Sequence, residues 1–327
     1  MKKPVLRWGL LSTARINRAV IKPLRASKRN ILSAVASRSS SKVEEYAKEW
    51  NIERTFDSYE AMLADPDIDV IYNSLPNHMH AEWTIKAMQA GKHVLCEKPM
   101  ALTVAELDAI AAAASQTGKV VAEAFMYRHH PQTILARELV LGGAIGKLQA
   151  IRGSFTFMMN TDVNIRLVPE MGGGSIWDIG CYPISFARYI AGAEPVEVFG
   201  QQVTGPTGVD DSFFGQMRFP GEVYAQFDSG FRTPFRTHIE IVGSEGTLTL
   251  AAPFKPGLKE KITHYTEAST ETIPVPRQEL YIGEVEDMAD CILLGKSPRM
   301  PLSDSRGNVA AIIALLESAK TGQPVQL

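Results

Sequence analysis

The chain has 327 residues, of which 45% are hydrophobic and 21% charged, so it is long enough for two ordinary globular domains. Its formal net charge is −2 and it has no basic block, so nothing indicates a nucleic-acid or membrane-surface partner. No apolar run suggests a signal peptide or membrane span. The three cysteines are too few and too widely spaced for a disulfide framework or a cysteine-based zinc site. We therefore expect a cytoplasmic protein.

The first part of the chain alternates short apolar strands with amphipathic helices. Strands are predicted over residues 5–11, 31–36, 70–75, 94–96 and 120–124. Helices are predicted over residues 16–24, 41–50, 58–63, 81–90 and 103–118. Two of these helices begin with a capping box, Ser41–Glu44 and Thr103–Glu106. The alternation predicts βαβ units and a parallel, doubly wound α/β sheet.

The pattern changes after about residue 126. Helices are predicted over residues 131–141, 175–190, 279–294 and 304–321. Strands are predicted over residues 147–158, 196–204, 211–219, 223–231, 237–242 and 247–250. Pro220-Gly221 and Gly243–Gly246 indicate hairpin turns. We therefore predict an α/β domain over residues 1–125 and an α+β domain with a large, mostly antiparallel sheet over residues 126–327, whose C-terminal helix can pack back on the first domain.

The first strand ends where an open parallel sheet binds its ligand. A dinucleotide-binding fingerprint would place glycines at positions 12, 14 and 17, where this chain has Ser12, Ala14 and Asn17. The strict pattern fails, but the small residues still allow a pyrophosphate to approach the N-terminus of the helix that starts near Ile16. A plain strand–helix turn is equally compatible with these residues.

The second strand ends without the Asp or Glu that an NAD site uses for the ribose 2′-hydroxyl. Ser37, Arg38 and Lys42 instead offer hydroxyl and cationic groups, which suit a 2′-phosphate. If a dinucleotide binds, these residues favour NADP over NAD. The alternative is a solvated polar turn.

Two later strand ends carry polar groups on the same side of the predicted sheet. Asn77 and His80 are expected to contact a cofactor; the alternative, a metal pair of His78 and His80, is weakened by the lack of a nearby acidic or Cys partner in the sequence. Glu97 and Lys98 follow the next strand, where a Lys is placed to act on a ligand, unless the pair closes the strand as a solvated turn.

Asp178 and Tyr182 are four residues apart on the helix that follows Gly172–Gly174, so they share one face. A carboxylate and a phenol placed together form a candidate acid/base pair. The alternative is a half-buried Tyr with a hydrogen-bond partner.

Together these motifs resemble the glucose–fructose oxidoreductase / inositol dehydrogenase (Gfo/Idh/MocA) family. The matching segments follow the family order over most of the chain: Gly9–Ile16, Ser74–His80, Glu97–Pro99, Gly172–Tyr182 and Val242–Gly246. Many members carry a His where this chain has Tyr182 and an Asp where it has Ser185. The Tyr form resembles the NADP-dependent D-xylose dehydrogenases, the dimeric dihydrodiol dehydrogenases and glucose–fructose oxidoreductase itself.

The resemblance implies an α/β Rossmann domain followed by an α+β domain with an open-faced sheet, which commonly forms a homodimer or tetramer. It implies hydride transfer between NADP, or less favourably NAD, and a hydroxyl-bearing carbon of a sugar or diol, with no metal. Lys98 would hydrogen-bond the reacting oxygen and favour the phenolate of Tyr182, and Asp178 would orient the substrate or Tyr182. The residues expected to face the cofactor are Gly9, Ser12, Thr13, Ala14, Arg15, Ile16, Ser37, Arg38, Lys42, Ser74, Leu75, Pro76, Asn77, His80, Glu97 and Lys98. The residues expected to line the substrate side are Arg128, His129, Asn160, Arg166, Asp178 and Tyr182.

Two other functions use the same fold. A non-catalytic NADP(H)-binding sensor needs none of Lys98, Asp178 and Tyr182, so their presence favours an enzyme. A redox-assisted glycoside hydrolase, which uses a tightly held cofactor for transient oxidation, is the second alternative. The sequence does not name the sugar, and we expect the loop over residues 159–174 to select it.

Overall fold

The computed structural model describes residues 5–161 and 164–327, which form two compact units. The first unit contains the chain up to His129 together with Tyr281–Arg306, and the second contains His130–Leu280 and Gly307–Leu327. The first boundary lies close to the predicted one at 125/126. Residues 281–306, which the prediction assigned to the second domain, belong instead to the first unit.

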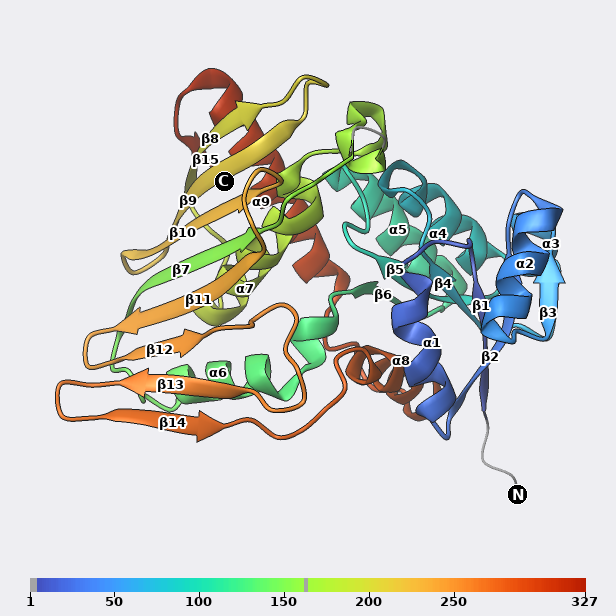
Figure 1. Cartoon of the computed structure of the whole chain (residues 1–327), viewed down its shortest axis with the longest axis horizontal. Coiled ribbons are helices and arrows are strands. Elements are labelled where there is room, and N and C mark those ends of the chain that lie inside the picture. The colour runs from blue at the N-terminus through green and yellow to red at the C-terminus, as the bar shows by residue number, and fades with distance from the viewer. Residues whose placement is uncertain (1–4, 162–163) are drawn as a thin grey trace. The chain divides into compact units, whose positions relative to one another are not determined.

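In the described part of the chain, the first unit contains a parallel sheet of six strands in the order β3-β2-β1-β4-β5-β6 (Figure 1). Its strands are β1 (Leu6–Leu10), β2 (Asn30–Ala36), β3 (Arg54–Phe56), β4 (Val70–Asn73), β5 (His93–Glu97) and β6 (Val121–Ala124). Its helices are α1 (Asn17–Ala26), α2 (Ser40–Trp50), α3 (Tyr59–Ala64), α4 (His80–Gln89), α5 (Val104–Thr117) and α8 (Ile282–Leu294). The predicted doubly wound sheet is confirmed, and its strand order reverses between β1 and β4, the position where such sheets bind ligands.

Helix α8 belongs to the first unit because its apolar face completes that unit's core. Val285 and Met288 are fully or almost fully buried in the same apolar cluster as Ile21 of α1. Arg29, between α1 and β2, forms ion pairs with Glu286 and with Asp290, the latter at 2.6 Å. Burial of apolar surface, rather than position in the sequence, therefore decides the membership of α8.

The two predicted capping boxes had different outcomes. In α5, the Thr103 hydroxyl accepts a hydrogen bond from the Glu106 N–H, and the Glu106 carboxylate accepts one from the Thr103 N–H, so this box is confirmed. In α2, the helix begins one residue earlier than predicted, with Ser39 at the N-cap and no side-chain capping bond. Ser41 is therefore already inside the helix, and the predicted box at Ser41 is wrong.

Among the described residues, the second unit contains a sheet of nine strands in the order β14-β13-β12-β11-β7-β10-β9-β8-β15. All neighbours are antiparallel except β7 and β10, which run parallel. The strands are β7 (Leu148–Thr156), β8 (Glu197–Thr204), β9 (Asp210–Phe219), β10 (Val223–Gly230), β11 (Arg236–Gly243), β12 (Thr247–Leu250), β13 (Lys261–Tyr265), β14 (Thr270–Pro274) and β15 (Val325–Gln326). The mostly antiparallel sheet and its hairpins at Pro220-Gly221 and Gly243–Gly246 were predicted correctly.

One face of this sheet is covered by helices. Helices α6 (Pro131–Leu141), α7 (Cys181–Ala191) and α9 (Leu302–Thr321) pack on it, and Figure 1 shows them behind the strands. On the other face, the exposed aromatic side chains of Phe214 and Tyr224 alternate with polar residues along β9 and β10. This open face is therefore mixed rather than broadly apolar.

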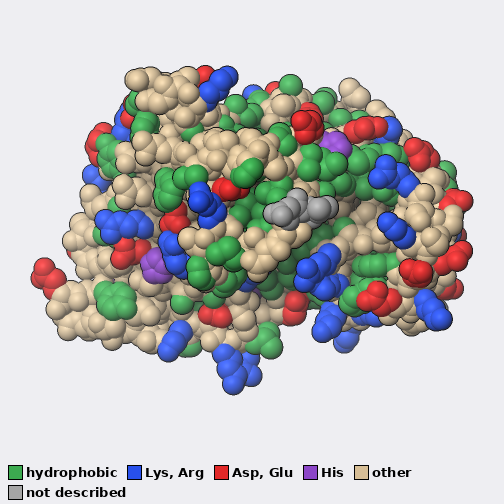
Figure 2. Space-filling view, turned by 45° about the horizontal axis from the view of Figure 1, so that its top comes forward, with side chains coloured by type: hydrophobic (Ala, Val, Ile, Leu, Met, Phe, Trp, Pro, Cys, Tyr) green, Lys and Arg blue, Asp and Glu red, His purple; other side chains and the backbone are tan. Residues whose placement is uncertain are grey.

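The described surface carries both signs of charge. On the face seen in Figure 2, acidic and basic side chains are interspersed. Among the described residues, no helix combines the length and the apolar character that a membrane span requires.

Candidate active site

In the first unit, a network of short polar side chains joins the turn after β1 to the turn after β4. The hydroxyls of Ser12 and Ser74 lie 2.8 Å apart, and Ser12 Oγ accepts a hydrogen bond from the Ala14 N–H at 3.0 Å. The fully buried Asn17 donates to the Ser12 carbonyl at 2.6 Å and accepts from the Ser74 hydroxyl at 2.5 Å. Ser12 and Ser74, which were expected to face a cofactor, use these hydroxyls to hold the two turns together.

The start of α1 is suited to an anion. Thr13, Ala14 and Arg15 form the turn, and Ile16 is the N-cap, without a side-chain hydrogen bond. The first N–H groups of a helix lack intrahelical partners and lie at the positive end of the helix dipole. Here no side chain caps α1, and the Asn17 and Ala19 N–H groups donate to the Ala14 and Ile16 carbonyls at 3.1 and 2.8 Å. The positive end of the helix dipole still suits the pyrophosphate of a dinucleotide.

Gly9 does not belong to this turn. It lies inside β1, where a Cβ atom would come within 2.7 Å of Met62 Sδ and 3.3 Å of Ile68 Cγ2. The absence of a side chain thus lets α3 pack closely on the sheet. Gly9 therefore has a packing role, and its expected place at the cofactor stays a prediction.

The turn after β2 presents the predicted cations to solvent. The side chains of Arg38 and Lys42 are exposed, whereas Ser37 is buried and its Oγ accepts a hydrogen bond from the Ser39 N–H at 3.3 Å. Within the described residues, Arg38 and Lys42 take part in no ion pair with a carboxylate. Both cations therefore remain available to a 2′-phosphate.

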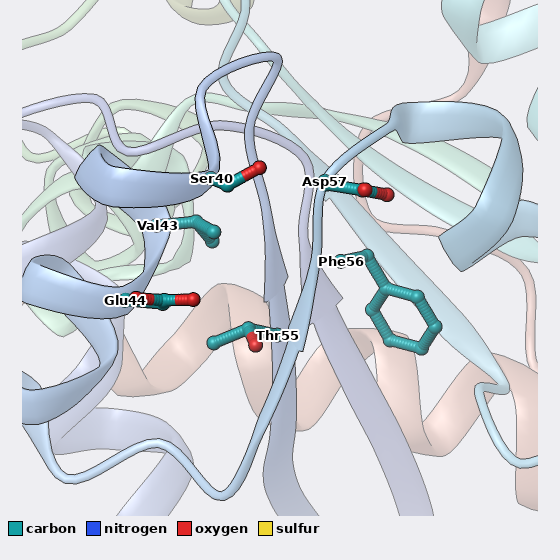
Figure 3. Close-up of a pocket in the computed structure, with 6 residues that line it drawn as sticks. All are labelled: Ser40, Val43, Glu44, Thr55, Phe56 and Asp57. Atoms are coloured by element: carbon teal, nitrogen blue, oxygen red, sulfur yellow. The ribbon is translucent and has the colours of Figure 1, made fainter.

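A hollow of about 340 Å³ lies next to this turn, between α2 and β3 (Figure 3). It is lined by Ser40, Val43, Glu44, Thr55, Phe56 and Asp57. Figure 3 shows the Glu44 side chain directed toward Thr55, while the Phe56 ring points away from α2. The carboxylates of Glu44 and Asp57 make this hollow unfavourable for a phosphate.

His80 is buried and does not face a ligand. Its Nδ1 lies 2.7 Å from the Pro99 carbonyl oxygen and its Nε2 lies 2.6 Å from the Leu75 carbonyl oxygen, and only 1% of the residue is exposed. The expected cofactor contact is therefore corrected: the ring joins the turn after β4 to the turn after β5. Burial lowers the pKa of His80 to about 4, so the ring is neutral near pH 7 and donates to one of the two carbonyls. Pro76 and Asn77, in the same turn, are partly exposed.

Lys98 follows β5 in a turn that is fixed on both sides. Glu97 accepts a hydrogen bond from the Tyr72 hydroxyl through one carboxylate oxygen and from the Lys98 N–H at 3.3 Å through the other. Beyond the cis Lys98–Pro99 peptide, the buried Glu123 accepts a hydrogen bond from the Met100 N–H at 2.8 Å. Sequence reasoning missed Tyr72 and Glu123, although polar residues inside otherwise apolar strands were a signal that was present.

Asp178 and Tyr182 occupy neighbouring turns in the second unit. Ile176–Gly180 forms a π-helical turn that leads into α7, so the predicted helix exists but begins irregularly. Asp178 Oδ2 accepts a hydrogen bond from Arg166 Nε at 2.5 Å. The charge of Asp178 raises the pKa of Arg166, and Tyr182 contributes in the same direction, so all three groups interact within one unit.

The entry to this π-helical turn is anchored by Asp210, the first residue of β9. Its buried carboxylate accepts hydrogen bonds from the Ser175 hydroxyl at 2.6 Å and from the Ile176 N–H at 2.9 Å, while burial raises its pKa to about 6. Gly174 has φ +110° and faces this carboxylate so closely that a Cβ would overlap it. Sequence reasoning missed Asp210 because its partners lie far away along the chain.

Two of the other expected substrate residues belong to the first unit and one lies in a loop of the second. Arg128 and His129 belong to the first unit and are buried, and Arg128 pairs with Asp304 at 2.7 Å. Burial lowers the pKa of His129 to about 3, so it is neutral although Asp287 lies 3.9 Å away. In the loop expected to select the substrate, Asn160 is exposed, and residues 162 and 163 lie outside the described residues.

Comparison with known proteins agrees with the resemblance. Residues 6–125 match the oxidoreductase family with an NAD-binding Rossmann fold, and residues 133–249 match the Gfo/Idh/MocA C-terminal domain. The chain is 34% identical to a D-xylose 1-dehydrogenase (NADP(+)) of Haloferax volcanii, covering 98% of this chain and 100% of that protein. It is 31% identical to a trans-1,2-dihydrobenzene-1,2-diol dehydrogenase of Xenopus laevis, covering 91% and 93%.

A solved structure gives the same picture at the level of the fold. The 3-ketoreductase KijD10 of Actinomadura kijaniata, in complex with NADP and TDP-benzene, superposes with a TM-score of 0.91 at 27% identity, covering 96% of this chain and 98% of that one. The strand order, the fixed Glu97-Lys98-Pro99 turn and these similarities lead to one conclusion. The chain belongs to the Gfo/Idh/MocA family of oxidoreductases.

Proposed function

We propose that the protein is an NADP-dependent oxidoreductase that transfers a hydride between the nicotinamide and a hydroxyl-bearing carbon of a sugar or diol. The observation that carries this proposal is the turn after β5, where hydrogen bonds from Lys98 and Met100 to two carboxylates hold the backbone on either side of the Lys98 side chain. A turn built in this way holds a cation at the carboxyl end of a central strand, where the ligand of an open sheet binds. The named activities of the relatives support the substrate class.

The cofactor preference rests on the turn after β2. NADP, when bound, supplies the hydride chemistry, and the chain supplies orientation and proton handling. The uncapped start of α1 would hold the pyrophosphate, and Arg38 with Lys42 would bind the 2′-phosphate. An NAD site would need a carboxylate in place of Arg38, because the free 2′-hydroxyl donates a hydrogen bond.

The proton of the reacting hydroxyl needs an acceptor as the hydride leaves. We assign this role to Tyr182, with Lys98 donating a hydrogen bond to the reacting oxygen and favouring the phenolate by its charge. Asp178 would then act indirectly, because its carboxylate is already paired with Arg166. Arg166, which interacts with both, would add a second cation on the side of the phenol.

We also propose a homodimer or tetramer that associates through the open face of the second sheet. Phe214 is 52% exposed and Tyr224 is 36% exposed on this mixed face, and association of two copies would cover both rings. Light scattering at micromolar concentration should give a mass well above the 35.9 kDa of one chain, and a monomer would contradict the proposal. The thiols of Cys96, Cys181 and Cys291 are buried, which fits a reducing, cytoplasmic setting.

The function is tested with purified protein, NADP or NAD, and a panel of aldoses and diols, following NADPH absorbance. Net NADPH formation with at least one substrate is expected, and Lys98→Met, which keeps much of the side-chain volume without the charge, should lose it. Binding of NADP without turnover of any substrate would instead indicate a sensor. Release of sugar from glycosides without net NADPH would indicate a redox-assisted hydrolase.

A further inference from the structure

The second sheet gathers several loops at the edge that carries the Tyr182 group. Strands β7, β10 and β12 end at this edge, and β9 and β11 begin there, as their pairing requires. The segments that leave it follow Thr156, Gly230 and Leu250 and lie on the right-hand side of this sheet in Figure 1. Because Asp210, at the start of β9, anchors the turn before α7, this edge also sets the position of Asp178 and Tyr182.

Phe235 is an exposed aromatic residue at this edge, in the loop between β10 and β11. Its residue surface is 61% exposed, although large apolar side chains are normally placed in a core. Its ring meets the buried Phe155 ring edge-on, with centroids 6.2 Å apart and planes at 84°. Phe155 in turn meets Tyr182 at 5.3 Å and 67°, so one chain of rings leads from solvent to the proposed acid/base.

The loop that carries Phe235 is held in place rather than left loose. The Thr156 hydroxyl donates a hydrogen bond to the Pro234 carbonyl at 3.0 Å, which fixes the residue before Phe235. Phe155 is also opposite Thr237 in the β7–β11 ladder. Since side chains alternate along a strand, this register directs Phe235 to the same side of the sheet as Phe155 and Tyr182.

A cation accompanies the exposed ring. Lys255 Nζ lies 5.7 Å from the centre of the Phe155 ring and 6.0 Å from that of Phe235, within the range of cation–π attraction. Lys255 follows the fully buried Phe254, whose ring stacks on Phe155 at 5.4 Å with planes 12° apart. The buried neighbour therefore fixes the position from which the lysine extends.

We propose that Phe235 and Lys255 form a substrate-recognition element, with the Phe235 ring packing against the apolar face of a cyclic substrate and the Lys255 ammonium donating a hydrogen bond to one of its hydroxyls. The inference rests on the proposed function and adds to it the class of substrate, a ring with one C–H face and several hydroxyls. A sugar ring presents such a face, and a rigid aromatic side chain can bind it at little entropic cost. An acyclic diol offers no comparable face.

The test compares substrates of different shape on matched variants. Phe235→Ala should raise KM for D-xylose and for trans-1,2-cyclohexanediol about tenfold, because the loss of one aromatic contact weakens binding by up to about tenfold. The kcat values should stay within about twofold of the wild type. KM for acyclic glycerol should not change, and Phe235→Tyr, which keeps the ring, should restore the wild-type KM. Tyr265→Ala is the control, and it should change no KM. Tyr265 is an aromatic residue that is 44% exposed, and it lies at the end of β13 that is far from the edge carrying Phe235.

Lys255→Met separates the two parts of the element. It keeps a flexible apolar stem and removes the donor, so KM should rise several-fold for D-xylose and less for trans-1,2-cyclohexanediol, which has fewer hydroxyls. If Phe235→Ala leaves KM for both cyclic substrates unchanged while Tyr182→Phe still abolishes turnover, the recognition element is disproved and the proposed function stands. If the wild type forms no NADPH with any substrate, the proposed function fails and this inference fails with it.

Discussion

Replacing Tyr182 by Phe separates the chemical role of the phenol from its packing role. Tyr182 is only 5% exposed, and its ring contacts those of Phe155 at 5.3 Å and Phe254 at 5.5 Å. Phe preserves both ring contacts, so the free energy of unfolding should change by no more than about 1 kcal/mol, the usual net value of one hydrogen bond. Tyr182→Ala would remove the ring from this cluster and cost about 3–5 kcal/mol, which would confuse a kinetic measurement.

The kinetic effect of Tyr182→Phe should be much larger than its effect on stability. A positioned general base contributes about 10²–10⁴-fold, so kcat should fall by about 10²-fold or more. The assay is kcat at saturating NADP, under conditions where chemistry is rate-limiting, together with NADP affinity from fluorescence, which should be nearly unchanged. Lys98→Met should be at least as severe, and the double variant should lose little more, because residues that act as a unit are not additive. A Tyr182→Phe enzyme within a few-fold of the wild-type kcat would refute the reasoning and leave the proton to Lys98 or a water.

Three further expectations follow from the first unit and from the anchor at Asp210. Arg38→Asp should lower the preference for NADP over NAD by about tenfold or more, since a charge-assisted hydrogen bond contributes about 1.5–3 kcal/mol; equal kcat/KM values for both cofactors in the wild type would contradict it. Gly174→Ala should lower both the thermal midpoint and kcat, whereas Gly208→Ala, at a comparable φ of +92° with no neighbour within 4 Å, should lower the midpoint less and leave kcat unchanged. In the unfolded chain His80 takes up a proton near pH 6.5, whereas in the folded protein the buried ring does so only near pH 4. The free energy of unfolding should therefore fall as the pH drops from 6.5 to 4, by up to about 1.4 kcal/mol per pH unit. His80→Gln should reduce that slope in urea titrations, and an unchanged slope would show that His80 is already charged and donates to both carbonyls.

The elements that could be predicted from the sequence are those whose own residues bear the signal. Five strands of the first sheet are short, mostly buried apolar runs, and the box at Thr103 lies next to the helix that it caps. The sixth strand, β3, was not predicted, because its residues Arg54–Phe56 are only partly buried and form no apolar run. Strands β13 and β14 escaped prediction because their residues are mostly exposed and polar, with Ile262 as the one fully buried apolar side chain of β13. Their position is set by pairing with β12 rather than by their composition.

The site could be predicted only as far as local patterns reach. Lys98, Asp178 and Tyr182 were singled out because they lie in compact motifs; the family that these motifs indicated is confirmed, and the roles of the three residues stay predictions. The residues that hold these motifs in position were not predicted, because contacts such as the hydrogen bond from Ser175 to Asp210 join residues that are far apart in the sequence. His80 was misread for the opposite reason: it lies beside a ligand motif, yet its ring is buried and bonds to two backbone carbonyls.

The return of residues 281–306 to the first unit has a consequence for how the chain is made. During translation the first 129 residues leave the ribosome long before α8 is synthesised. Until then, the apolar surface of Ile21 and its neighbours, which α8 covers in the folded protein, stays exposed. The second unit, too, is completed only by its last segment, Gly307–Leu327. A shortened clone that stops at His129 should therefore aggregate, whereas one that joins His129 to Tyr281 through a flexible linker should yield a folded cofactor-binding unit.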